Sequence, residues 1–180
     1  AHFPLSLSFL TLQAISMLID ASAQKATDHP QLLPVSSYLL MFPKALSGPI
    51  ARFQDITSQI KQRNTGLSQT AAGIRRFMHG FAKKALIADQ LALITSRELF
   101  SQSPLRLPAG LAWLGLLCYT LQIYFDFSGY SDMAIGLGRM FGFEFLENFN
   151  YPYIAGSIRE FWRRWHISLS TWFRDYVFIP

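Results

Sequence analysis

The sequence predicts an all-helical (all-α) protein that crosses a membrane several times. Hydrophobic residues make up 51% of its 180 residues and charged residues only 15%, whereas a soluble domain carries roughly a quarter charged residues. The run from Leu107 to Phe125 contains no charge and approaches the ~20 helical residues that a hydrocarbon core requires. Ten of the sixteen Lys and Arg residues lie between Lys44 and Arg106, which predicts that this block faces the cytoplasm.

Charge and cysteine usage argue against several other classes of protein. The net charge is +5, but long uncharged runs separate the basic residues, so nucleic acid is not expected as a partner. Cys118 is the single cysteine, which excludes an internal disulfide framework. No set of His, Cys, Asp or Glu residues has the spacing of metal ligands, and no metal is expected.

The first part of the chain predicts one membrane helix followed by a broken segment. Phe3–Ile19 carries no charge and is predicted to be a first transmembrane helix, with a polar loop from Asp20 to Pro30 after it. Leu32–Phe42 is a second apolar run, and it meets Pro43 and Pro49. Because proline removes a helical hydrogen bond, a kinked or re-entrant segment is expected here.

A long helix is predicted from Ser68 to Phe100. Apolar residues recur along it at helical spacing, and Ser68 is of the type that caps helix N-termini. His79 lies within this helix beside Gly80, and a polar helix position explains it without a catalytic role.

Two carboxylates follow the uncharged run Leu107–Phe125. Asp126 and Asp132 lie where an apolar helix meets polar residues, and ionisable groups at membrane depth point to function. The alternative is structural, with both acids paired to arginines such as Arg139 or those near His166.

The glycines after Asp132 invite a nucleotide-loop interpretation that the spacing does not support. Gly136, Gly138 and Gly142 have the wrong intervals for a dinucleotide loop, and no strand is predicted before them. Small residues at a close helix contact are the better explanation.

The last segment, Ser157–Pro180, is predicted to be one amphipathic helix with His166 on its polar side. Its apolar positions recur at steps of three and four: Ile158, Phe161, Trp162, Trp165, Leu169, Trp172, Phe173 and Tyr176. A polar stripe has the same spacing: Arg159, Arg163, His166, Ser170 and Arg174. Two interpretations remain open. The stripe either receives an anionic or thioester substrate, with His166 as the titratable group, or lies at a membrane surface as a basic interfacial helix.

Longer motifs resemble a known family. The stretch YFDFSGYSDMAIGLGRMFGFEFLENFNYPY (Tyr124–Tyr153), followed by FWRRWHISLSTWFRDYVFIP (Phe161–Pro180), is similar to the membrane-bound O-acyltransferases in their bacterial alginate O-acetyltransferase branch. SFLTLQAISMLID and MFPKALSGPIARFQDI near the start resemble the same branch. The resemblance therefore covers essentially the whole chain.

The resemblance implies a polytopic helical enzyme of the bacterial inner membrane. Such an enzyme moves an acyl group from a thioester donor, acetyl coenzyme A or an acylated carrier, to a hydroxyl of an exported polysaccharide. His166 would match the histidine of the W-H-x-S-x-S segment and accept the hydroxyl proton as a neutral imidazole. Arg163, Arg164 and Arg174 would hold the anionic donor, with Ser170, Asp126 and Asp132 supporting the site.

The same resemblance implies that the site is shared with a later segment. The family has a second histidine in a G-x-W-H-G type segment, and no histidine here lies in a matching motif. We therefore expect residues 1–180 to be one partial domain from the middle of a longer enzyme, inactive alone. The expected partners are the lipid bilayer, an acyl carrier and periplasmic acetylation proteins. The rival hypothesis is a membrane transport or scaffold protein.

Overall fold

The computed structural model describes residues 7–22, 32–45, 48–61, 63, 65–95 and 108–179. Regular structure in these ranges is helical, as the sequence predicts, apart from one isolated antiparallel bridge between Phe149 and Trp165. In chain order the helices are α1 (Leu7–Ser22), α2 (Leu32–Leu39), α3 (Phe42–Ala45), α4 (Phe53–Lys61), α5 (Leu67–Ala82), the π-helical η1 (Lys83–Ala88), α6 (Asp89–Ile94), α7 (Ala109–Met140), the short 3-10 turn η4 (Pro152–Ile154), α8 (Ile158–Arg164), α9 (Ile167–Phe173) and the π-helical η5 (Arg174–Phe178).

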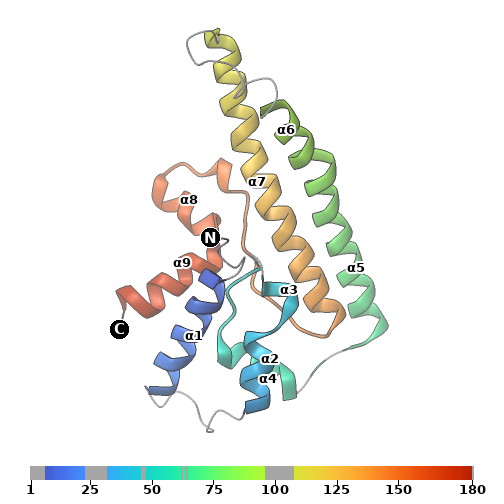
Figure 1. Cartoon of the computed structure of the whole chain (residues 1–180), viewed down its shortest axis with the longest axis vertical. Coiled ribbons are helices and arrows are strands. Elements are labelled where there is room, and N and C mark those ends of the chain that lie inside the picture. The colour runs from blue at the N-terminus through green and yellow to red at the C-terminus, as the bar shows by residue number, and fades with distance from the viewer. Residues whose placement is uncertain are drawn as a thin grey trace.

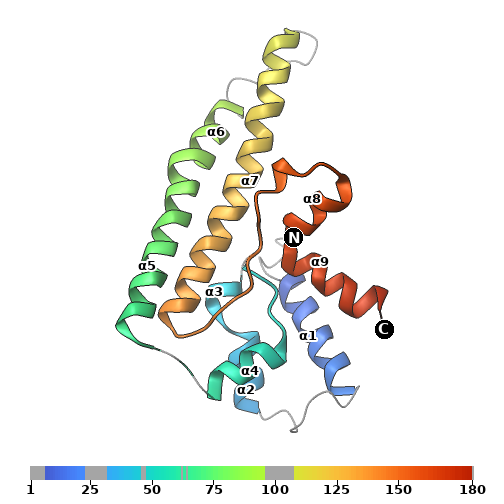
Figure 2. The ribbon, with the colours of Figure 1, turned by 180° about the vertical axis from the view of Figure 1, so that it is seen from behind.

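A long antiparallel pair of helices dominates the structure (Figures 1 and 2). The continuous rod of α5, η1 and α6 lies along α7, and glycines make the close approach possible. A Cβ added at Gly136 would lie 2.6 Å from the Phe77 backbone nitrogen, and one at Gly80 only 2.4 Å from the Gly129 carbonyl oxygen. The prediction of close helix packing is confirmed for Gly136, whereas Gly142 adopts a positive φ of 78° in the turn after α7.

The long helix predicted from Ser68 is confirmed, but its cap is not. The helix begins at Leu67, the N-cap residue is Gly66, and no side chain caps it. The hydroxyl of Ser68 therefore does not serve as the predicted cap. The six-residue π-helical stretch η1 lies inside the rod, and the predicted end at Phe100 falls outside the described residues.

Helices α1 to α4 form a second group beside the C-terminal half of α7 (Figure 1). The main buried apolar cluster joins α2, α4, α7 and the segment after α7: Tyr38, Ala51, Phe53, Ile56, Ile135, Phe143 and Phe145. The apolar run predicted to be kinked is indeed interrupted, because α2 ends at Leu39 and α3 starts at Phe42. Pro43 lies in the first turn of α3, where its missing N–H costs no hydrogen bond.

Lys44 is buried, although the sequence assigns it to the basic, cytoplasm-facing block. Its side chain is 1% exposed, and its Nζ donates to Gln13 Oε1 at 2.8 Å. The ammonium also lies 3.7 Å from the centre of the Tyr38 ring. Burial lowers the pKa of Lys44 to about 7, since the charged amine loses its hydration.

No helix within the described ranges is both long enough and apolar enough to cross a membrane. The two spans predicted from Phe3–Ile19 and Leu107–Phe125 are therefore not confirmed. The first corresponds to α1, a helix of 16 residues in which Gln13, Ser16 and Asp20 are the buried positions. The second forms the first half of α7, which continues for 32 residues through both aspartates. Asp20, predicted to begin a loop, lies within α1.

Candidate active site

The segment predicted to be one amphipathic helix is broken at His166, and this break forms the candidate site. Helix α8 ends at Arg164, Trp165 is extended, and His166 has φ 45° and ψ 55°, the left-handed conformation, before α9 starts at Ile167. A single polar stripe through Arg159, His166 and Arg174 therefore does not form. The physical reason is a competing set of backbone hydrogen bonds from residues 148–150.

Residues 148–150 run antiparallel to the break and take over its hydrogen bonds. The Asn150 amide donates to the Arg164 carbonyl at 2.9 Å, and the Ile167 amide donates to the Asn148 carbonyl at 3.0 Å. Phe149 and Trp165 form the isolated bridge between these two bonds. On the other side of the break, the His166 carbonyl accepts from the amides of Leu169 and Ser170, which starts α9.

The imidazole of His166 lies among aromatic rings. Its centroid is 4.7 Å from that of Phe127 in α7, in an edge-on arrangement, and 6.4 Å from that of Phe9 in α1. Further aromatic contacts surround the break: Tyr124, Phe149, Tyr153 and Phe161 all pack against Trp165. These rings cover part of the imidazole, and His166 as a whole is half-buried.

The ring nitrogen Nε2 of His166 is buried and has no hydrogen-bond partner among the described residues. Burial lowers the pKa of His166 to about 4, because the charged imidazolium is poorly solvated there. At neutral pH the ring is therefore uncharged, and one of its nitrogens is an acceptor. An acceptor without a partner suits a group that takes a proton from a ligand.

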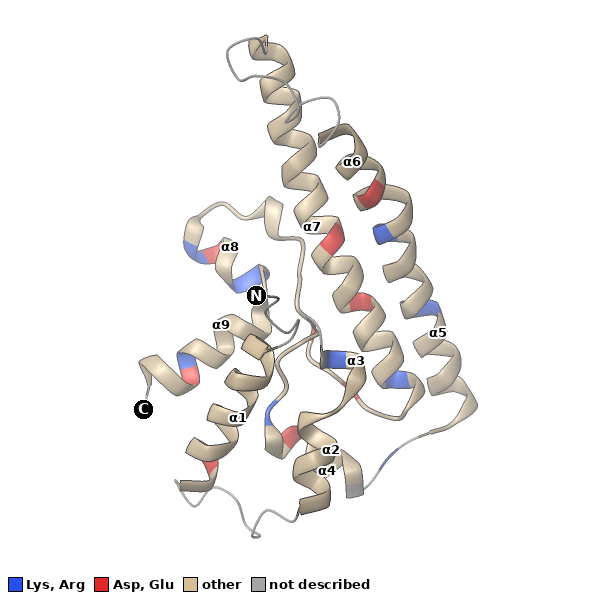
Figure 3. Ribbon diagram, viewed as in Figure 1, with Lys and Arg blue, Asp and Glu red and all other residues tan. Residues whose placement is uncertain are grey.

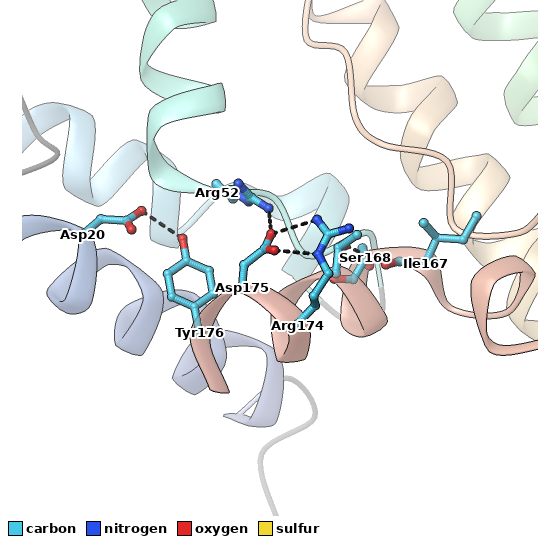
Figure 4. Close-up of polar contacts among 8 residues, drawn as sticks. Asp20, Arg52, Ile167, Ser168, Arg174, Asp175 and Tyr176 are labelled. Carbon is cyan, nitrogen blue, oxygen red and sulfur yellow. Dashed lines mark hydrogen bonds and ion pairs between the residues drawn. The ribbon is translucent and has the colours of Figure 1, made fainter. Parts of the chain in front are cut away.

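The three arginines predicted to bind the donor differ in their hydrogen bonds and ion pairs. Arg164 donates twice to Glu160, at 3.0 and 2.8 Å, and once to the Asn150 carbonyl at 3.2 Å. Arg174 pairs with Asp175 at 2.7 Å, and Asp175 also pairs with Arg52 (Figure 4). Arg163 is exposed and forms no ion pair with the described residues. Arg163 is thus the most available of the three for an anionic ligand.

Hydrogen bonds of polar side chains attach the C-terminal helices α9 and η5 to α8 and α1. The Ser170 hydroxyl donates to the Trp162 carbonyl at 3.1 Å and so links α9 to α8. Tyr176 donates to Asp20 at 2.9 Å, as Figure 4 shows, and Trp172 Nε1 donates to the Leu12 carbonyl at 3.2 Å. These two bonds attach α9 and η5 to α1.

The two aspartates of α7 face α5 and η1, and neither contacts an arginine near His166. Asp132 accepts from Arg76 at 2.7 Å and from Lys83 at 2.6 Å, and its side chain is 10% exposed. Asp126 pairs with Lys84 at 2.7 Å and is largely exposed. Both acids are therefore ion-paired, but with residues of α5 and η1 and not with Arg139 or the arginines near His166. Figure 3 shows acidic positions (red) along α7 and basic positions (blue) along the neighbouring α5.

Comparison with known proteins shows the family to which the chain belongs. A model of the membrane-bound O-acyltransferase family matches residues 2–180. The chain belongs to this family. The resemblance inferred from the sequence motifs is thereby confirmed, and membership makes the chain part of a membrane protein.

Three relatives of the family show the range of similarity. The chain is 50% identical over 176 residues to the probable alginate O-acetylase AlgI of Pseudomonas aeruginosa, a match that covers 98% of this chain and 33% of the relative. It is 34% identical to the peptidoglycan O-acetyltransferase of Helicobacter pylori (98% and 38% covered) and 31% identical to the teichoic acid D-alanyltransferase of Bacillus subtilis (97% and 45% covered). The chain spans about a third of the length of the AlgI relatives.

The O-acyltransferase motifs predict His166 as a site residue, but sequence reasoning missed one residue that holds the break. Asn148 is 1% exposed, and its side chain hydrogen-bonds Ser131 in α7 and Ser168 in α9. Asparagine is typical of turns and connecting segments, so its residue type alone does not indicate this role. Its contacts lie 17 and 20 residues away in the chain, so no local pattern indicates them.

Proposed function

We propose that this chain is the His166-bearing part of a membrane O-acyltransferase that moves an acetyl group from a thioester to a polysaccharide hydroxyl. The observation that carries the proposal is the half-buried, neutral imidazole of His166, whose buried Nε2 lacks a described partner, within a chain of this family. The higher identity to the alginate acetylases, 50% against 34% and 31%, favours an alginate-type polymer.

The proposed reaction needs one proton acceptor near the acceptor hydroxyl. The hydroxyl gives its proton to the imidazole of His166 while its oxygen bonds to the thioester carbonyl carbon. The carbon–sulfur bond then breaks, and the leaving thiolate takes the proton from the imidazolium. The products are an ester and a free thiol, and His166 returns to its neutral form.

The remaining parts of the proposal concern binding and location. Arg163, on the exposed side of α8, binds the phosphate of the donor's phosphopantetheine or coenzyme A. Arg174 and Arg164 support this region through their ion pairs with Asp175 and Glu160. We place the enzyme in the bacterial inner membrane, with the donor on the cytoplasmic side and periplasmic acetylation proteins as partners, and we assign residues 1–180 to one domain of it.

An acetyl-transfer assay tests this function. The full-length protein in lipid vesicles receives radiolabelled acetyl coenzyme A or an acetylated carrier, together with alginate, peptidoglycan or teichoic acid. We expect alkali-labile label in alginate, because an O-acetyl ester is cleaved by base. Label in another polymer would contradict alginate as the acceptor. No label in any polymer would favour the transport or scaffold hypothesis.

A further inference from the structure

The backbone at His166 has to be held in place by its neighbours. A non-glycine residue in the left-handed region costs about 1–2 kcal/mol, and His166 is one of two such described residues, with Tyr151. The conformation turns the chain between α8 and α9 and so determines where the imidazole points. Whatever stabilises this turn also sets the position of the ring.

Asn148 makes hydrogen bonds to both residues that follow His166. Its backbone carbonyl accepts from the Ile167 amide at 3.0 Å. Its side-chain Oδ1 accepts from the Ser168 amide at 3.2 Å and from the Ser168 hydroxyl at 2.7 Å. Three bonds from one residue thus fix the first turn of α9 directly after the left-handed position.

The other end of the Asn148 side chain is attached to α7. Its Nδ2 donates to Ser131 Oγ at 3.1 Å, and Ser131 lies one helical turn after Phe127, whose ring contacts His166. The Ser168 hydroxyl in addition accepts from the Ile50 amide at 3.0 Å. Asn148 therefore connects α7 to the start of α9, and Ser168 in turn connects α9 to Ile50 before α4. These bonds join the helix that carries Phe127 to the turn that carries His166.

We propose that Asn148 is a positioning residue that holds the imidazole of His166 in its reactive orientation. The proposal rests on the proposed function, in which that imidazole accepts the hydroxyl proton. A misplacement of about 1 Å can lower a rate by about 100-fold. The contacts of Asn148 with Ile167 and Ser168 follow His166 in the chain, and its contact with Ser131 lies one turn from Phe127, which packs on the imidazole. Its effect on rate is therefore transmitted by His166.

The first test is the Asn148→Ala variant of the full-length protein, with Thr95→Val as its matched control. Thr95 is also buried, and its hydroxyl hydrogen-bonds Gln122 at 2.8 Å, between α6 and α7 and away from the break. Asn148→Ala should lower kcat at least about tenfold and change the KM values less than about threefold, whereas Thr95→Val should keep kcat within about twofold. A wild-type kcat in Asn148→Ala would overturn the proposal.

A double variant separates positioning from general stability. If Asn148 acts through His166, adding Asn148→Ala to His166→Asn should lower the residual rate no further. Independent, multiplying losses would overturn the proposal. If Asn148→Ala does not accumulate in the membrane, Ser131→Ala replaces it, since this change removes only the Nδ2 contact. We then expect a smaller fall in kcat than in Asn148→Ala. An unchanged kcat would contradict the positioning role of Asn148.

Chemical labelling reports how accessible the imidazole of His166 is, and this measurement does not depend on enzyme activity. Diethyl pyrocarbonate modifies accessible neutral imidazoles, and mass spectrometry follows the modification at His166. We expect faster modification in Asn148→Ala than in the wild type and in Thr95→Val. Equal rates would overturn the proposal. If His166→Asn were fully active, the proposed function would fall, and the labelling result alone would decide the role of Asn148.

Discussion

Replacing His166 by asparagine is expected to lower kcat of the full-length enzyme by about 10²- to 10⁴-fold, the usual contribution of a general base. Asparagine tolerates the left-handed backbone found at His166, so the break between α8 and α9 is kept. Its amide cannot accept a proton at neutral pH. The variant should therefore have a lower kcat, while the amount of protein in the membrane stays at the wild-type level.

The matched control for this variant is His79→Asn. His79 is exposed on α5, in the rod that packs on α7, and its replacement should leave kcat unchanged. Initial rates of labelled acetyl transfer, divided by the amount of protein in the vesicles, give the comparison. If the His166→Asn enzyme kept more than about a tenth of wild-type kcat, His166 would not be the proton acceptor.

Replacing Gly80 by alanine is expected to destabilise the folded protein by about 3 kcal/mol, the upper end of the usual cost of overpacking. The added Cβ would lie 2.4 Å from the Gly129 carbonyl oxygen and 2.7 Å from the Met133 backbone nitrogen. Both are backbone atoms of α7, so no side chain can rotate out of the way. The two helices would have to separate along their contact.

Gly110→Ala is the control for this packing argument. A Cβ at Gly110 meets no atom within 4 Å, and alanine is favoured over glycine in a helix by about 1 kcal/mol. Its unfolding midpoint in detergent should be unchanged or raised, while that of Gly80→Ala falls. Equal midpoints for the two variants would show that the α5–α7 contact is looser than described.

The helix pairing was predictable in part because its causes are local. Small residues at Gly136 and uncharged runs at helical spacing are visible in the sequence, and so is the approximate extent of the α5–α6 rod. The partners of Asp132 were not predictable. Arg76 and Lys83 face it only because α5 and α7 pack antiparallel in one register, which no short stretch of sequence determines.

The break at His166 could not be predicted because a distant segment causes it. Residues 158–179 contain neither glycine nor proline, and their apolar residues fit one continuous helix. The hydrogen bonds from Asn148 and Asn150 outweigh this local preference. The motif Trp165-His166 therefore predicts which residue belongs to the site, whereas the geometry that leaves Nε2 without a described partner depends on tertiary contacts.

The protonation of His166 is the measurement that tests the central claim most directly. The full-length protein, labelled with ¹³C-histidine, is titrated by nuclear magnetic resonance, and His166→Asn assigns the signal by its absence. Burial lowers the pKa of His166 to about 4, so we expect a neutral ring at every pH above about 6 and half-protonation near pH 4. A pKa at or above the ordinary value of 6.5 would contradict the account, because the surroundings of the ring would then not disfavour its charged form.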